Sequence, residues 1–351
     1  MSKINIIYLL PEMKGASGGA KVIYNHSLLL NRLNKKTESF IVHLKKKLTY
    51  KFELSLAKKI KFLNKNIGGW DAKKMKVSNN FLPDNNWYND RIKIIKNLKF
   101  NKDRDFIIFP EIFGHFAEEL EFKKKGIKYG IFVQGSFHMS SSENFSKIKS
   151  SYENANLIIS TSSYSIDFIK NLFPKCKKNI LKINLSVNTI INKNLKKNYI
   201  TCMPRKLPSH FFLLQFYLQN KIPNNWKIDI IDNVSKKELL DKLKRSKLFL
   251  SFSHFEGFGL PPLEAALTGN KVIGYIGGGG KEYWKKPIFN EIEYGEIRKF
   301  GDTILKEIDT YNNNWIKKTE VTRNNLAKKY SKISERKSLI DLSNKIIKFF
   351  R

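Results

Sequence analysis

The stretch from Leu248 to Trp284 reads LFLSFSHFEGFGLPPLEAALTGNKVIGYIGGGGKEYW and carries the clearest fold signal in the chain. The apolar run 248–252 is typical of a buried β-strand, and a loop rich in glycine and proline follows it. We expect a helix over 262–268, ended by Gly269, and a second buried strand over 271–275. This strand–helix–strand order is typical of a parallel sheet covered by helices.

The same alternation continues in both directions from this stretch. On its N-terminal side we expect strands at 199–203 and 226–231 and helices at 208–219 and 236–244. Earlier in the chain, apolar runs predict strands at Ile4–Leu10, Ser39–His43, Phe106–Phe109, Lys128–Val133, Asn156–Ser160 and Ile180–Leu185. A helix is predicted to begin near Gly18. The sequence therefore predicts an α/β protein with two parallel sheets.

Length and charge limit the function only broadly. A chain of 351 residues, 41% of them hydrophobic, can bury two ordinary cores. Lys and Arg number 65 against 31 Asp and Glu, which gives a net charge of +34. Such a charge suits nucleic acid or an anionic membrane surface, but the lysines are scattered along the chain, so a compositional bias is the favoured explanation. The charge alone does not identify a function.

Several features indicate a cytoplasmic protein. No apolar run approaches the roughly 18–20 residues that span a bilayer. Met1–Leu10 has the pattern of a first strand and not of a secretory signal. Cys176 and Cys202 lie far apart and lack the spacing of a metal site, so we expect two reduced thiols. Peripheral contact with the inner face of an anionic membrane is compatible with these observations.

The loop after strand 248–252 carries groups suited to a phosphorylated ligand. Ligands collect at the carboxyl ends of strands in open α/β sheets, and a helix that begins there offers backbone N–H groups to a phosphate. Gly257 and Gly259 allow the backbone to approach a ligand closely. We expect Glu264 in the first helical turn, where it could accept hydrogen bonds from ribose hydroxyls. The alternative is that Glu264 only stabilises the helix dipole.

The segment EGFGLPPLEAALTGNKVI resembles the E-x7-E segment of retaining GT-B glycosyltransferases, especially those of glycosyltransferase family 4. The resemblance is strongest over 235–284 and looser over the whole chain. It implies a GT-B architecture, in which two Rossmann-like domains face a central cleft. Residues 1–195 would form the acceptor side and 196–335 the donor side, and a helix at 336–351 would pack back on the first domain. The alternative for that helix is an anionic membrane surface.

The resemblance also implies roles for single residues. Glu256 would face the donor sugar as a catalytic group, and Glu264 would hold the nucleotide ribose. The backbone of Gly257, Phe258, Gly259 and Leu260 would contact the diphosphate and sugar. Gly279 and Gly280, with Glu282, approximate a Gly-Gly-x-x-Glu element of the family, although a flexible surface loop is an equal alternative.

Two further segments are expected to contact the donor. Arg205 and Lys206 follow the strand at 199–203, where cations could neutralise a diphosphate, and the family often has a basic pair there. Gly18 and Gly19, within the segment Gly15–Ala20, resemble the family's Gly-Gly-Ala element. The bland alternatives are two solvated charges and an ordinary strand-to-helix turn.

The first domain also offers candidates for catalysis or acceptor binding. Glu111 follows the strand at 106–109. Gln134, Gly135 and, shortly after them, His138 follow the strand at 128–133. His115 is a further candidate. A lone histidine is more often a structural or surface residue. We include Glu111 and His138 among the catalytic candidates because both follow strand ends.

No metal or cofactor is expected. The D-x-D pair Asp103 and Asp105 precedes a strand, at the wrong end for a site, and is interpreted as a turn. The expected partners are a nucleotide-sugar donor and a saccharide or lipid-linked acceptor, and not nucleic acid. The prediction is sugar transfer to an acceptor hydroxyl with retention, in cell-surface polysaccharide or glycolipid synthesis. A nucleotide-sugar epimerase or phosphorylase, a basic nucleic-acid-binding protein and a non-catalytic relative remain alternatives.

Overall fold

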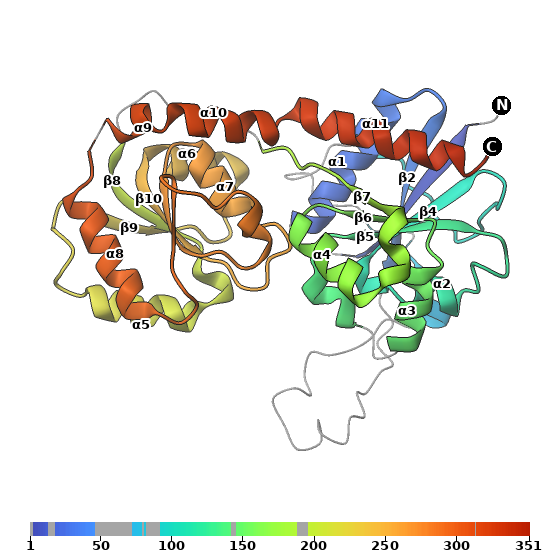
Figure 1. Cartoon of the computed structure of the whole chain (residues 1–351), viewed down its shortest axis with the longest axis horizontal. Helices are drawn as coiled ribbons and strands as arrows, with labels where there is room; N and C mark the ends of the chain where they lie inside the picture. Colours follow the sequence, from blue (N-terminus) through green and yellow to red (C-terminus); the bar gives the residue numbers. More distant parts are fainter. Residues whose placement is uncertain are drawn as a thin grey trace, which may run out of the picture. The chain divides into compact units, whose positions relative to one another are not determined.

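The chain forms two compact units in a computed structural model (Figure 1). Unit 1 consists of Met1–Ile183 and Arg336–Arg351, and unit 2 of Asn184–Glu335. The structure describes residues 3–12, 18–45, 72–78, 81, 92–141, 145–187, 196–312 and 314–351. The division falls before the 195/196 boundary predicted from sequence. The reason is that the segment after Ile183 pairs with the end of unit 2: the Val187 N–H donates to the Tyr330 carbonyl over 3.0 Å.

Unit 1 is built on a seven-stranded sheet in the order β3-β2-β1-β4-β5-β6-β7. Its strands are β1 (Ile4–Pro11), β2 (Thr37–Lys45), β3 (Lys76–Val77), β4 (Asp105–Pro110), β5 (Lys128–Val133), β6 (Leu157–Ser160) and β7 (Ile180–Lys182). All neighbours are parallel except β2 and β3. Its helices are α1 (Gly18–Leu33), α2 (Phe116–Glu119), α3 (Phe145–Glu153) and α4 (Ser163–Leu172). The six strands predicted in this half are confirmed, and the short β3 was not predicted.

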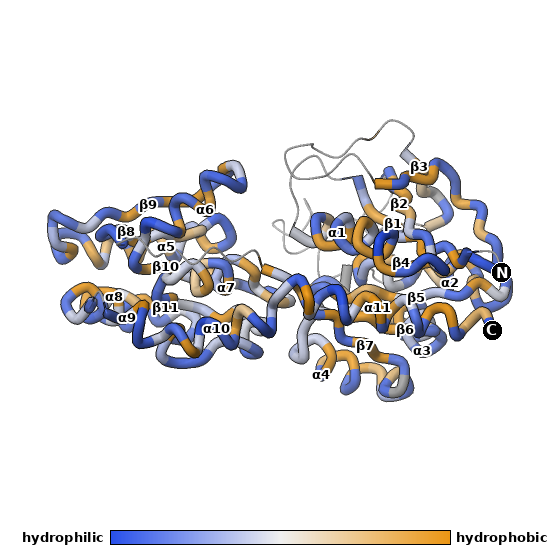
Figure 2. The backbone as a smooth tube through the Cα atoms, turned by 90° about the horizontal axis from the view of Figure 1, so that it is seen from above, coloured by the Kyte–Doolittle hydropathy of each residue, from blue (hydrophilic) through white to orange (hydrophobic). Residues whose placement is uncertain are grey.

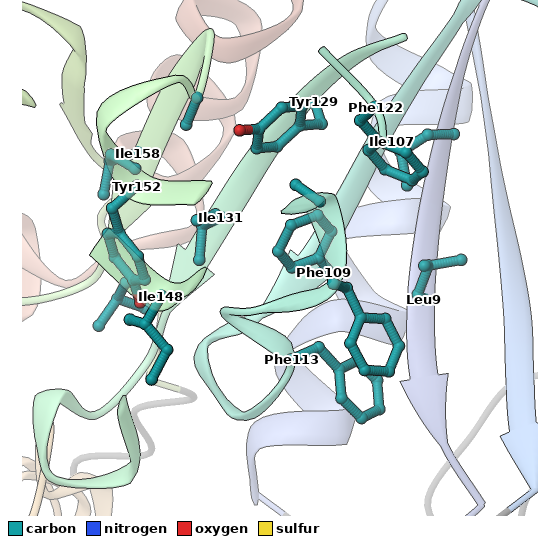
Figure 3. Packing of buried hydrophobic residues seen from close by; sticks show 14 of the residues in the cluster. Leu9, Ile107, Phe109, Phe113, Phe122, Tyr129, Ile131, Ile148, Tyr152 and Ile158 are labelled. Carbon is teal, nitrogen blue, oxygen red and sulfur yellow. The ribbon is translucent and has the colours of Figure 1, made fainter. Parts of the chain in front are cut away.

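The sheet of unit 1 is buried on both faces. Phe106 and Ile108 of β4 face a core that includes α1, whereas Ile107 and Phe109 face a second core with residues of α2 and α3 (Figure 3). A strand covered on both sides needs an apolar residue at every position, which explains the continuous runs in the sequence. Hydrophobic segments recur along the strands, and hydrophilic segments predominate in the loops around them (Figure 2).

The C-terminal helix α11 (Lys332–Lys348) contributes to the first of these cores. Leu339, Leu342 and Ile346 are fully buried among residues of β1, β4 and α1. The Ser343 hydroxyl accepts a hydrogen bond from the Asn34 amide over 2.8 Å. The protein therefore covers most of the apolar side of this helix, as the packing alternative expects, while Ile340 remains 37% exposed.

Unit 2 is built on a five-stranded parallel sheet in the order β12-β11-β10-β8-β9. Its strands are β8 (Lys197–Cys202), β9 (Lys227–Ile230), β10 (Ser246–Phe252), β11 (Lys271–Tyr275) and β12 (Phe289–Glu291). Its helices are α5 (Pro208–Leu218), α6 (Lys236–Arg245), α7 (Leu260–Leu267), α8 (Ile297–Asp309), α9 (Trp315–Lys318) and α10 (Glu320–Lys329). The strand order reverses between β8 and β10, and a reversal of this kind creates a ligand-binding crevice at the carboxyl ends of the strands.

Candidate functional site

Three loops of unit 2 meet at the carboxyl ends of its parallel strands. The short 3-10 turn Pro204–Lys206 follows β8, the loop 253–259 follows β10, and the 3-10 turn Gly279–Glu282 follows β11. Because β8, β10 and β11 are adjacent and parallel, all three loops emerge at one edge of the sheet. The segments predicted to bind the donor in this half of the chain are therefore brought together.

The two glycine-containing loops of unit 2 are locked to each other through their backbones. The Glu256 N–H donates to the Gly277 carbonyl over 2.8 Å, and the Gly279 N–H donates to the Glu256 carbonyl over 2.9 Å. A Cβ atom at position 279 would lie 2.0 Å from the Gly257 carbonyl oxygen. Gly279 and Gly280 are buried. The flexible-loop alternative for these glycines is therefore wrong, since they allow two main chains to touch.

Helix α7 begins earlier than the sequence predicts. It starts at Leu260, after Gly259 with a φ of +80°, so the two prolines occupy its second and third positions. Proline is tolerated there because the N–H groups of a first turn have no helical partner. The prediction that Glu264 lies in the first turn is wrong: it lies in the second turn and is half-buried. A favourable interaction with the helix dipole is consequently a weak explanation for the presence of Glu264, because that interaction decays within the first turn.

Four successive backbone N–H groups of this loop have no hydrogen-bond acceptor in the described part of the chain. They are the N–H groups of residues 257–260. Gly257, Phe258 and Gly259 are nevertheless buried. Buried backbone N–H groups are nearly always paired, and a run of unpaired ones beside a helix N-terminus is suited to an anion.

A charged pair lies beside these N–H groups. Lys206 Nζ lies 2.6 Å from Glu256 Oε1, although the two residues are fifty positions apart in the sequence. The Glu256 side chain is 24% exposed and the Lys206 side chain 42%. Arg205 is exposed and forms no ion pair with the residues that the structure describes. The predicted catalytic residue Glu256 is thus in contact with the predicted donor-binding residue Lys206, while Arg205 is exposed.

Tyr283 supports the turn that begins α7. Its buried hydroxyl donates a hydrogen bond to the Gly259 carbonyl, and burial raises the pKa of this hydroxyl well above its ordinary value. The neighbouring Glu282 faces elsewhere, with a carboxylate oxygen 3.8 Å from Lys329 Nζ and 3.4 Å from the Tyr330 hydroxyl. Gly279 and Gly280 of the predicted Gly-Gly-x-x-Glu element therefore contribute to the interlocked loops, while the Glu282 carboxylate lies near Lys329 of α10.

Sequence reasoning missed a cluster of histidine and tyrosine side chains next to the Lys206–Glu256 pair. The His210 ring nitrogen lies 3.1 Å from the Tyr275 hydroxyl, and the His210 and Tyr294 ring centres are 5.0 Å apart. His254 stacks on Tyr294 at 5.3 Å. Burial, followed by Lys206 and His210, lowers the pKa of His254 below its ordinary value. The position of His254 directly before Phe255 and Glu256 was the available signal, whereas nothing in the sequence marks Tyr294.

In unit 1, Gly19 lies at the start of α1 and contacts the loop after β5. The Gln134 amide donates to the Gly19 carbonyl over 3.2 Å, and a Cβ at position 19 would lie 3.3 Å from Gln134 Oε1. A Cβ at Gly18 would meet nothing within 4 Å. Residues 15–17 of the predicted glycine-rich turn lie outside the described residues.

Glu111 is held inside unit 1. It is 5% exposed, and its two carboxylate oxygens accept hydrogen bonds from the N–H groups of Gln134 and Gly135 over 3.2 and 2.9 Å. Burial raises the pKa of Glu111 to about 7, against the lowering effect of these hydrogen bonds. The geometry thus gives Glu111 a structural contact with the loop after β5.

The histidine candidates of unit 1 differ in burial. His138 is exposed in the 3-10 turn Ser136–Ser141. His115 is buried, with Nε2 3.9 Å from a Glu119 carboxylate oxygen. Asp105, the second residue of the D-x-D pair, accepts hydrogen bonds from Asn5 and from the Asn101 N–H at the start of β4.

Metal-binding clusters and membrane-spanning helices are both absent from the residues that the structure describes. These residues contain no group of three or more His, Cys, Asp or Glu side chains placed to hold a metal ion. Across the same parts of the chain, no helix is both long and apolar enough to cross a membrane.

Comparison with known proteins finds similarity in structure only. No protein-family model matches the sequence, and no curated protein matches it significantly. The structure resembles that of TarM with a TM-score of 0.60 at 16% identity, covering 97% of this chain and 99% of that chain. It also resembles WaaB, a lipopolysaccharide outer core galactosyltransferase, with a TM-score of 0.60 at 15% identity, covering 99% and 100% of the two chains.

A third comparison involves a structure with bound ligands. An S. aureus TarM mutant in complex with fondaparinux, alpha-GlcNAc-glycerol and UDP matches with a TM-score of 0.55 at 18% identity. The match covers 69% of this chain and 56% of that one, so this chain spans little more than half of that protein. Together with the two largely parallel sheets, these similarities show that the chain has a GT-B fold, as predicted.

Proposed function

We propose that this chain is a retaining glycosyltransferase that binds a nucleotide-diphosphate sugar on unit 2 and transfers the sugar to an acceptor hydroxyl. One observation carries the proposal: the N–H groups of residues 257–260, which have no partner in the described part of the chain, lie next to the Lys206–Glu256 pair. The fold that the chain shares with TarM and the galactosyltransferase WaaB supports it. The E-x7-E resemblance supports retention and membership of family 4.

The donor diphosphate would bind at the N-terminus of α7. The N–H groups of residues 257–260 would donate to its oxygens, and Lys206 and Arg205 would neutralise its charge. A hydrogen bond with one charged partner contributes about 1.5–3 kcal/mol, so several of them suffice to hold a diphosphate. We propose that no metal ion takes part, because the N–H groups and cations together can stabilise the leaving diphosphate.

The Lys206–Glu256 contact suggests how donor binding prepares the site. In the free protein each charge neutralises the other over 2.6 Å. A bound diphosphate would attract Lys206 and release the Glu256 carboxylate to accept hydrogen bonds from the sugar hydroxyls. Glu264 would accept hydrogen bonds from the ribose. Each carboxylate would thus act only once the nucleotide is in place.

Unit 1 would supply the acceptor side. Gly18 and Gly19 at the start of α1 and the loop that carries Gln134 and His138 are the proposed contributors. Glu111 would hold that loop through its hydrogen bonds to Gln134 and Gly135. Exclusion of water around the transferred sugar would limit hydrolysis of the donor.

The acceptor class follows from the neighbours by analogy. WaaB is named as a lipopolysaccharide outer core galactosyltransferase, and the TarM complex contains alpha-GlcNAc-glycerol and UDP. We propose a saccharide or lipid-linked acceptor, with a role in cell-surface polysaccharide or glycolipid synthesis at the cytoplasmic side of a membrane.

Calorimetric titration with a panel of nucleoside diphosphates, in the presence and absence of EDTA, tests this function. We expect one of them to bind, with an affinity that EDTA does not change. Glu264→Ala should weaken that binding by about tenfold or more, because the ribose loses a charged acceptor. Glu293→Ala, an exposed carboxylate of the same unit, is the matched control.

Two results would count against the assignment. If no nucleoside diphosphate binds, the anion site is not a donor site. If Glu264→Ala and Glu293→Ala bind equally well, Glu264 does not hold the ribose. Product analysis with and without an acceptor then separates a transferase from an epimerase or a phosphorylase.

A further inference from the structure

Helix α5 exposes large apolar side chains on its outward face. Phe212, Leu213 and Phe216 are 65%, 55% and 75% exposed. The opposite face of the helix carries Phe211 and Leu214, which are buried against the sheet and α8. A surface helix usually has a polar outward face, so apolar side chains on both sides indicate that something else covers the outer one.

Cations lie near both ends of α5. Lys221, just after the helix, lies 3.6 Å from the centre of the Tyr217 ring. The Tyr217 hydroxyl donates to Asp302, whose other carboxylate oxygen lies 3.8 Å from Arg298 Nε. The exposed Arg205 precedes the helix by three positions. Aromatic and aliphatic side chains flanked by Lys and Arg are typical of a helix that lies in a membrane interface.

We propose that the outward face of α5 docks on an anionic lipid surface, with Phe212, Leu213 and Phe216 inserted among the lipids. The charge favours this occupant over a second copy of the chain. Each copy carries a net charge of +34, so pairing two copies brings like charges together, whereas anionic lipid neutralises them.

The position of α5 gives this docking a consequence for the candidate site. His210, in the first turn of α5, contacts Tyr275 and Tyr294, and Lys206 lies just before the helix. Phe255 and Tyr294, which belong to the same edge of the sheet, are also exposed. Docking through α5 would therefore hold the strand-end loops of unit 2 close to the lipid surface, within reach of lipid-linked molecules.

Vesicle co-sedimentation of the full chain tests the proposal. The probes are vesicles of phosphatidylcholine alone and of phosphatidylcholine mixed with phosphatidylglycerol, at low and high salt. We expect binding to the mixed vesicles that partly survives high salt, because insertion of apolar groups is not screened whereas charge attraction is. The double variant Phe212→Gln and Phe216→Gln should lose at least about tenfold in affinity, because two buried aromatic side chains are removed from the lipid contact.

The matched control replaces two other exposed apolar residues, Val321→Gln and Ile333→Gln. The control should bind vesicles like the unaltered protein, and both double variants should keep its unfolding temperature. The α5 variant should also keep its affinity for the nucleoside diphosphate, which separates this proposal from the function proposed above.

Three results would overturn the membrane proposal. The first is no binding of the unaltered chain to mixed vesicles. The second is binding that high salt abolishes completely or that the Phe212 and Phe216 replacements leave unchanged. The third is a dimer in light scattering that these replacements dissociate, because a second copy would then be the occupant.

Discussion

The strand-end loops of the two units use a glutamate in opposite ways. In unit 1, Glu111 follows β4 directly and is buried, and both of its carboxylate oxygens accept hydrogen bonds from backbone N–H groups. In unit 2, Glu256 follows β10, is partly exposed, and uses its main chain to join two loops while its carboxylate contacts Lys206. One carboxylate holds the scaffold, and the other faces a place where a ligand could bind.

The backbone N–H groups of the strand-end loops also differ between the two units. The N–H groups of Gln134 and Gly135 are occupied by Glu111, whereas those of residues 257–260 have no partner among the described residues. A carboxylate after a strand is therefore a weak indicator of function by itself. Whether its neighbouring N–H groups are already bonded decides between a structural and a ligand-binding role.

The largest effect is expected for Gly279→Ala. The added methyl would lie 2.0 Å from the Gly257 carbonyl, so the two loops of unit 2 must separate. We expect a loss of more than about 4 kcal/mol in the free energy of unfolding, or loss of the unit 2 fold. Chemical denaturation measures it. Gly295→Ala is the control, because position 295 has a positive φ and an open Cβ direction; it should cost only about 1 kcal/mol. Equal costs would show that the two loops do not interlock.

Next in size is the effect of Glu256→Gln on turnover. The proposed contact with the donor sugar forms fully only in the transition state, so turnover should fall roughly 100- to 1,000-fold, while nucleotide affinity changes little. Steady-state kinetics and calorimetry separate the two effects. Turnover like that of the unaltered enzyme would remove Glu256 from the catalytic machinery and would erase the contrast with Glu111.

Glu111→Gln should change stability as a function of pH. The pKa of Glu111 is about 7 in the folded chain against an ordinary value of 4.5, so the folded state binds more protons between these values. The stability contributed by this group is present below about pH 4.5 and is lost as the pH rises through 7, a difference on the order of 3 kcal/mol. Denaturation at both ends of this window, with and without the substitution, measures it. A pH dependence that is identical in the variant would contradict a buried, titrating Glu111.

The smallest effect is expected for Tyr283→Phe. It leaves the Gly259 carbonyl without its donor, which should cost about 1 kcal/mol in unfolding free energy and weaken nucleoside-diphosphate binding several-fold. Tyr311→Phe is the matched control, because the buried Tyr311 hydroxyl has no hydrogen-bond partner in the described part of the chain. That control should be neutral or slightly stabilising. Equal effects in the two variants would show that the Tyr283 contact does not support the turn.

Sequence by itself determined the order of ten strands and placed each within a few residues of its observed bounds, but it did not predict the short strands β3 and β12. Lys128–Val133 is a strand at the predicted residues, and 271–275 likewise. These elements are readable because a parallel strand that is buried on both faces must be apolar at every position. The E-x7-E stretch likewise locates the loop that carries the candidate site.

Only the tertiary structure decided how that site is assembled. The start of α7 depends on Tyr283 bonding to Gly259, and the Lys206–Glu256 contact joins residues that are fifty positions apart. The burial of Glu111 and the outward apolar face of α5 also depend on which neighbours cover them. Propensity and periodicity act over a few residues, whereas these features arise from contacts between distant segments, so no local pattern could reveal them.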